Sequence, residues 1–188
     1  MHRIQKISSY LLIVFNVLII ALPLSAVMTW LFIETEFMKN IISNSPLFKY
    51  VQTPEGFISL SEIKWTLISK IIGFVACTLG ALPIFLSLFS LKSIFQNYQK
   101  GKIFTIINAQ HYRRLGILFF LDALLATPIG DTLMILAATL SNPPGHRYIS
   151  ISFGPPNVEA LFCGILVMVI SWVMLEASTL HEEQQLTI

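Results

Sequence analysis

The sequence predicts an all-α membrane protein, a bundle of four transmembrane helices with two small outer loops that can contain short β-strands. Hydrophobic residues make up 55% of the 188 residues and charged residues only 12%, unlike a soluble globular domain. Four apolar runs are each long enough to cross a hydrocarbon core of about 30 Å. Positive charge gathers in one segment between the second and third runs. The length allows a single membrane domain, residues 1–188.

The four apolar runs predict transmembrane spans at about residues 10–32, 65–91, 115–140 and 158–176. The first run competes with a signal peptide, because Leu24-Ser25-Ala26 resembles a cleavage site. It continues to Ile33, which a signal peptide would not need, so a transmembrane helix is favoured. Pro23 predicts a kink in the first span, and Pro128 with Gly130 predicts a kink or a partly unwound turn in the third.

The basic loop between the second and third spans, residues 92–114, sets the predicted orientation. It contains no acidic residue and carries Lys92, Lys100, Lys102, Arg113 and Arg114. Loops rich in lysine and arginine stay in the cytoplasm, so both chain termini are also expected to be cytoplasmic. Within the loop, Gly101 is expected to end one helix and Thr105 to cap the next.

The two outer loops, residues 34–64 and 141–157, contain turn signals and apolar residues together. The first loop is expected to form a short hairpin or an interfacial helix, after which Ser59 or Ser61 caps the second span. In the second loop, residues 148–153 alternate as a strand does. This strand is expected to pair with the first loop, because a lone strand leaves its backbone groups unpaired.

Polar residues in or beside the spans are candidates for three pairs. At about 1.5 Å per residue, similar depths are expected for Asn16 and Asp122, for Lys70 and Asp131, and for Glu176 and Arg114 with its neighbour Arg113. Such pairs hold transmembrane helices together, so a structural role is favoured over chemistry. The alternative is a proton or ion path. Asp122 and Asp131 would lie on opposite faces of an unbroken helix, and no inverted repeat supports a transporter.

The sequence predicts no enzyme, with no catalytic residue, no cofactor site and no metal site. The four histidines are dispersed, and no HExxH, GxSxG or P-loop pattern is present. Cys77 and Cys163 lie in separate apolar runs without a CxxC pair, and they are interpreted as buried small apolar residues. The net charge of +2 argues against direct nucleic-acid binding.

Three motifs in the second half of the chain resemble a known family. They are Gly101-Lys102-Ile103-Phe104-Thr105 followed by Asn108, Arg113-Arg114-Leu115-Gly116, and the ending Glu176-Ala177 with Leu180, Glu182-Glu183 and Leu186-Thr187-Ile188. With these motifs in this order, the chain resembles the bacterial four-helix membrane family of the domain of unknown function 2975. The resemblance implies a multi-pass protein of the bacterial cytoplasmic (inner) membrane.

The resemblance implies no established activity. Members of that family are often encoded next to a very small helix-turn-helix regulator, which implies a regulatory or sensory role with a cytoplasmic DNA-binding partner. The expected contact residues are Lys100, Lys102, Arg113, Arg114, Glu182 and Glu183. Anionic membrane lipid is the other expected partner of the basic residues, and a second copy of the chain is a further candidate. The runner-up function is a small transporter or a factor for tolerance to membrane-active compounds.

Overall fold

The computed structural model describes residues 2–44, 51–53, 56–140, 142–143, 145–151 and 155–186. The chain divides into two compact units. Unit 1 comprises residues 1–22, 82–124 and 155–188, and unit 2 comprises residues 23–81 and 125–154.

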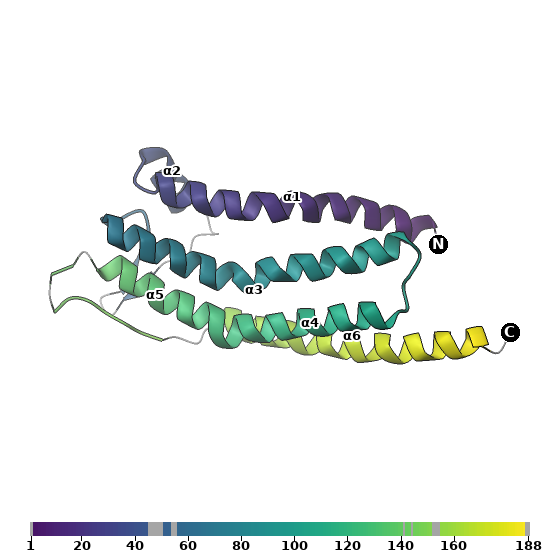
Figure 1. The fold of residues 1–188 in the computed structure, drawn as a ribbon. Helices are drawn as coiled ribbons and strands as arrows, with labels where there is room; N and C mark the ends of the chain where they lie inside the picture. The colour runs from purple at the N-terminus through teal and green to yellow at the C-terminus, as the bar shows by residue number, and fades with distance from the viewer. Residues whose placement is uncertain are drawn as a thin grey trace. The chain divides into compact units, whose positions relative to one another are not determined.

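Four long helical segments account for the predicted spans (Figure 1). They are α1 (His2–Phe32), α3 (Leu67–Gln99), α6 (Pro155–Leu186), and a continuous run of α4 (Ile106–Leu121), the π-helical turn η1 (Asp122–Ala126) and α5 (Thr127–Thr139). All four are long and apolar enough to cross a membrane. The predicted all-α membrane fold is therefore confirmed.

The helices are longer than the predicted spans. Helix α3 continues to Gln99 and α4 begins at Ile106, so only residues 100–105 of the predicted basic loop lie outside helices. The shortest candidate span has 28 residues, or about 42 Å, against a hydrocarbon core of about 30 Å. Each helix therefore continues past the core.

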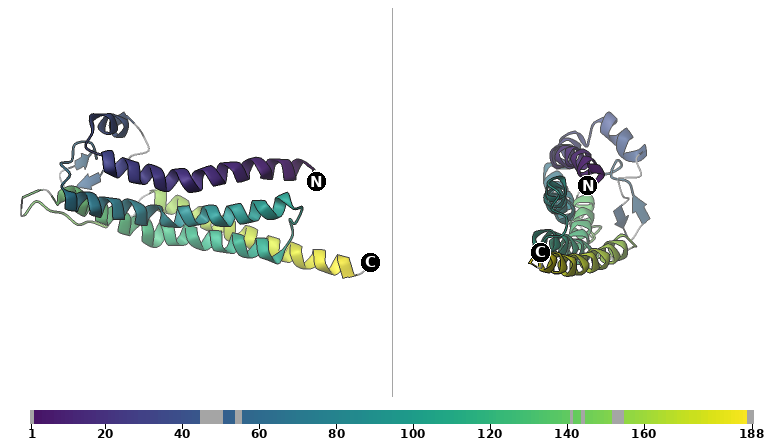
Figure 2. Two further views of the ribbon diagram at one scale, coloured as in Figure 1. Left: turned by 45° about the horizontal axis from the view of Figure 1, so that its top comes forward. Right: turned by 90° about the vertical axis from the view of Figure 1, so that its right-hand side faces the viewer.

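In unit 1, the helices pack as neighbours in the order α1, α3, α4 and α6 (Figure 2). The ring centroids of Phe15 on α1 and Phe95 on α3 are 5.5 Å apart. The hydroxyls of Tyr98 on α3 and Tyr112 on α4 are 2.9 Å apart. The start of α1, the end of α3, the start of α4 and the end of α6 share one end of the unit (Figure 1). We call this the corner end.

Helices α4 and α6 run antiparallel and meet along buried small residues spaced seven apart. Ala109, Gly116 and Ala123 lie on the α4 side, and Ser171, Gly164 and Asn157 lie on α6. A spacing of seven residues returns to nearly the same face of a helix, and small residues let two backbones approach closely. A Cβ on Gly116 would lie 3.2 Å from the Gly164 carbonyl oxygen, so the backbones meet at this point. We call this contact the α4–α6 seam.

Unit 2 contains a small apolar core around the end of α1 and the start of α3. Its other elements are α2 (Glu36–Asn44), α5, and an antiparallel hairpin of β1 (Val51–Thr53) and β2 (Gly56–Ile58). Trp30 and Trp65 meet edge to face with ring centroids 5.1 Å apart. The Trp30 indole lies so close to Gly73 of α3 that a Cβ there would overlap it. The first outer loop thus forms both of the predicted alternatives, a short helix and a hairpin.

The predicted strand in the second outer loop is wrong. Among residues 145–151, which the structure describes, none is in a strand; residues 152–153 lie outside the described residues. The backbone bonds instead to threonines of α5. The Tyr148 N–H donates to Thr139 Oγ1 over 3.2 Å, and Thr132 Oγ1 donates to the Ser150 carbonyl over 3.2 Å. Helix side chains therefore satisfy backbone groups that the strand would have paired.

The predicted cap of the second span is also wrong. Ser59 and Ser61 bond to each other, with their Oγ atoms 2.8 Å apart. Helix α3 begins at Leu67, directly after a capping box formed by Thr66 and Ser69. In this box the Ser69 N–H donates to Thr66 Oγ1 over 3.2 Å. The Thr66 N–H donates in return to Ser69 Oγ over 2.7 Å. A reciprocal box of this kind satisfies two backbone donors at a helix start.

Candidate functional site at the corner end

Helix α3 ends in a tight turn around a glycine. Gly101 has a φ of +76°, a left-handed conformation that glycine adopts without strain. Its N–H donates to the Tyr98 carbonyl over 3.0 Å, and the Lys102 N–H donates to the Asn97 carbonyl over 2.9 Å. These bonds satisfy the last carbonyls of α3. The predicted helix end at this glycine is confirmed.

Helix α4 begins with a second set of bonds, centred on Asn108. Thr105 is the N-cap, as predicted, and its side chain accepts from the Asn108 N–H. The Asn108 side chain is fully buried and donates to the carbonyls of Lys102 and Ile103, each over 2.8 Å. Its oxygen accepts from Asn97 Nδ2 over 2.7 Å. A buried amide with all of these partners holds the loop between α3 and α4 in one conformation.

The corner end presents charges of both signs. Lys100 and Lys102 are exposed, and neither forms an ion pair with another residue in the described part of the chain. Lys6, near the start of α1, is exposed at the same end. Glu182 and Glu183 are exposed near the end of α6. Basic and acidic side chains are thus both exposed at the corner end.

The α4–α6 seam shows that the predicted pair of Arg114 and Glu176 is wrong. In the register of the seam, Arg114 is level with residue 166. Glu176 therefore lies about ten residues, or about 15 Å, closer to the corner end. Both side chains are exposed, and no ion pair joins them. The prediction assumed that the last residue of the fourth span is level with the first residues of the third, but the register of the seam places residue 176 before the first residue of α4.

The same register shows how far α6 extends. Residue 174 is level with Ile106, the first residue of α4. About 12 residues of α6, or about 18 Å, therefore project past the start of α4. Figures 1 and 2 show the yellow end of α6 running beyond the corner. Ser178 is still buried, whereas residues 179–184 are all exposed.

Lys70 forms an ion pair with a residue that the sequence prediction placed in the outer loop. Its Nζ lies 2.6 Å from Glu34 Oε2, with the two side chains 28% and 51% exposed. Glu34 follows α1 directly and Lys70 is in the first turn of α3, so the pair joins two helix ends in unit 2. This corrects the predicted partner, Asp131, which has an interaction of its own. A pair this exposed contributes about 0–1 kcal/mol.

The predicted hydrogen bond between Asn16 and Asp122 is not formed among the described residues. In unit 1, α1 contacts α3, as in the hydrogen bond from Gln99 Nε2 to Ser9 Oγ over 3.0 Å. Asp122 is buried at the start of η1, on the far side of α3 in the helix order, and has an interaction of its own. The order of the helices separates the two residues.

The structure has the π-helical turn η1 where a kink around Pro128 was predicted. Asn157 of α6 donates a hydrogen bond to this turn. In a π turn the N–H of residue i+5 donates to the carbonyl of residue i, so the donor for Ala123 would be residue 128. Proline has no N–H. Asn157 Nδ2 instead donates to the Ala123 carbonyl over 2.8 Å, in a buried setting. The prediction missed Asn157, although its spacing of seven from Gly164 and Ser171 is a detectable signal.

The described residues include no group of three or more His, Cys, Asp or Glu side chains that could hold a metal ion. The chemistry that the corner end offers is recognition by charge. A loop of fixed conformation presents two lysines, and a projecting helix presents two glutamates.

Comparison with curated proteins yields no match, and comparison with solved structures yields none either. The family model described as "Protein of unknown function (DUF2975)" matches residues 5–188. Four residues of the motifs that resemble this family have structural roles. Gly101, Thr105 and Asn108 fix the connection between α3 and α4 at the corner end, and Gly116 lies at the α4–α6 seam. The chain is a multi-pass membrane protein that belongs to the DUF2975 family.

Proposed function

We propose that the chain is a non-enzymatic regulatory or sensory protein of the bacterial inner membrane, which binds a small cytoplasmic helix-turn-helix regulator at its corner end. The observation that carries the proposal is the extension of α6 by about 18 Å past the start of α4. This extension lies at the same end of unit 1 as the exposed residues Lys100 and Lys102. Neither feature is needed to cross a membrane. Both are suited to contact with a partner in water.

The distribution of basic residues supports a cytoplasmic corner end. Residues 92–114 contain five basic residues and no acidic one, whereas the segments 34–64 and 141–157 together contain four basic residues and four acidic ones. Arg3 and Lys6 add to the positive charge at the corner end. Lysine and arginine in short segments beside membrane spans favour the cytoplasmic side.

Charge also suggests how a DNA-binding partner is held. A helix-turn-helix protein uses a basic surface to neutralise DNA phosphates. Glu182 and Glu183 offer carboxylates to that basic surface, while Lys100 and Lys102 pair with acidic residues elsewhere on the partner. A regulator bound in this way is kept from DNA, so the membrane protein acts by sequestration and a signal acts by release.

The experiment is affinity purification of the full chain from its native host in mild detergent, with mass spectrometry of the soluble proteins that remain bound. We expect a small helix-turn-helix protein to bind the wild type and to be displaced by duplex DNA. The paired change Lys100→Gln and Lys102→Gln should abolish its recovery. The matched control, Lys64→Gln with Arg147→Gln, removes two basic residues of unit 2 and should leave recovery unchanged.

Two outcomes would count against the proposal. One is the recovery of no DNA-binding protein with the wild type. The other is equal recovery with the wild type and the corner variant, which would remove the corner lysines from the contact.

A further inference from the structure

Arg113 and Arg114 belong to the predicted basic loop, but the structure separates them from the corner. They lie about two helical turns, or about 11 Å, from the first residue of α4. They belong to the helical run Ile106–Thr139, which as a whole is long and apolar enough to cross a membrane. Both side chains are exposed, and neither forms an ion pair with any residue that the structure describes.

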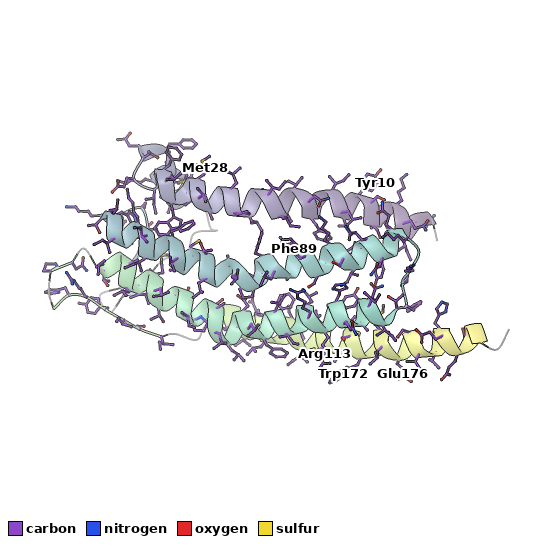
Figure 3. The ribbon with its side chains drawn as sticks, viewed as in Figure 1. Tyr10, Met28, Phe89, Arg113, Trp172 and Glu176 are labelled. Carbon is purple, nitrogen blue, oxygen red and sulfur yellow. The ribbon has the colours of Figure 1, made fainter. Side chains whose placement is uncertain are left out.

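Exposed apolar side chains lie beside Arg113. At about 100° per residue, Ile106, Arg113 and Ile117 share one flank of the α4–α6 seam, and Arg114 lies about 100° farther round α4. Ile106 is 40% exposed and Ile117 is 43% exposed. Trp172 lies on the same flank of α6 and is 65% exposed. Figure 3 shows Arg113 and Trp172 on the same side of unit 1.

The direction of the side chains brings the guanidinium groups and the indole to similar levels. Trp172 is level with residue 108 in the register of the seam. Cα–Cβ bonds tilt toward the start of a helix, so the side chains of Arg113 and Arg114 lean toward the corner end. Tryptophan is enriched at membrane–water interfaces, and arginine snorkels to the same layer. The two arginine heads and Trp172 thus lie at similar levels along unit 1.

A guanidinium beside apolar side chains needs an anion, and among the described residues of unit 1 no carboxylate lies at the level of the two arginines. Glu176 lies about nine residues, or about 13 Å, from the level of Arg113 toward the corner end. Glu159 lies about eight residues, or about 12 Å, in the opposite direction. Copies that stand side by side in one orientation keep these levels, so unit 1 of a second copy supplies no carboxylate either. The remaining candidate is the phosphate of a phospholipid, the anion that a membrane surface supplies.

We infer that Arg113 and Arg114 form a binding site for the phosphate of an anionic phospholipid, with Trp172 packed against the same lipid. The planar guanidinium group binds phosphate through two parallel hydrogen bonds, which a lysine cannot do. This site is distinct from Lys100 and Lys102, and it does not rest on the proposed protein partner. The basic segment therefore has two parts, one for lipid and one for a partner in water.

The test uses the full-length protein in nanodiscs of phosphatidylcholine with a minority of phosphatidylglycerol. Native mass spectrometry measures the phosphatidylglycerol that remains bound after mild release from the disc. Arg113→Gln with Arg114→Gln should lower this retention about thirty-fold, the product of two single-residue contributions. Lys100→Gln with Lys102→Gln removes the same net charge but leaves both guanidinium groups in place, so it should lower retention clearly less than the arginine variant does.

Equal losses in the two variants would overturn the inference, because they would show diffuse attraction to the whole basic segment. Unchanged retention in the arginine variant would also overturn it. Arg113→Lys with Arg114→Lys keeps the charge, so its retention should fall between that of the wild type and that of the glutamine variant. Recovery of the protein partner depends on the lysine pair, so failure of the lipid site and failure of the proposed function are distinguishable.

Discussion

Replacing Gly116 by leucine is expected to separate α4 from α6 and to lower the free energy of unfolding by about 3 kcal/mol or more. A Cβ at this position would lie 2.8 Å from Met168 Cγ and 3.2 Å from the Gly164 carbonyl oxygen. The Met168 side chain is flexible and moves at small cost. The Gly164 oxygen belongs to the backbone of α6, so the whole helix must shift to make room.

Titration with SDS in mixed micelles measures this loss of stability. Gly116→Ala should cost about 1–3 kcal/mol, and Met168→Ala in the same chain should restore part of it. The control is Gly80→Ala on α3, where a Cβ meets only the Ala126 carbonyl oxygen at 3.9 Å. Because alanine favours a helix over glycine by about 1 kcal/mol, this control should be neutral or stabilising. A Gly116→Leu protein as stable as the wild type would show that the seam is not a close contact.

Removing the amide of Asn157 is expected to cost about 1–3 kcal/mol in the wild type, because the buried Ala123 carbonyl loses its donor. Residue 128 cannot supply one while it is proline. In a Pro128→Ala chain it has an N–H that can donate to Ala123, so the cost of Asn157→Ala should fall by about 1 kcal/mol or more. The two residues are therefore predicted to be coupled, although they belong to different helices.

A double-mutant cycle measures this coupling from the unfolding free energies of the wild type, the two single variants and the double variant. Ala160→Ser, one helical turn along α6, serves as a control substitution outside the seam, and its cost should be the same with Pro128 or Ala at position 128. If the costs of Asn157→Ala and Pro128→Ala add to within about 0.5 kcal/mol, Asn157 does not replace the missing proline N–H.

The features that could be predicted from the sequence depend on near neighbours in the chain. Gly101 and Thr105 act on backbone groups within a few residues, so the end of one helix and the start of the next were predictable. The continuation of α3 past its predicted span was not. This helix continues through polar residues to Gln99, because a change from apolar to polar side chains marks the membrane surface but does not end a helix.

The predicted polar pairs failed because they depend on register and on helix order. Depth was counted from the predicted inner-surface end of each apolar run, which placed Arg114 level with Glu176. The order α1, α3, α4 and α6 also separates Asn16 from Asp122 in unit 1. Cys163 was interpreted as buried but is exposed, because apolar residues of a membrane span can face lipid instead of a core.

The proposed function depends on a cytoplasmic corner end, and labelling of single cysteines tests that orientation most directly. In a chain with Cys77 and Cys163 replaced by alanine, Lys102→Cys and Arg147→Cys each introduce one exposed thiol. A membrane-impermeant maleimide should label position 147 on cells with a permeable outer envelope and an intact inner membrane. Position 102 should react only after the inner membrane is opened. Labelling of position 102 before the inner membrane is opened would contradict a cytoplasmic corner and the partner proposed for it.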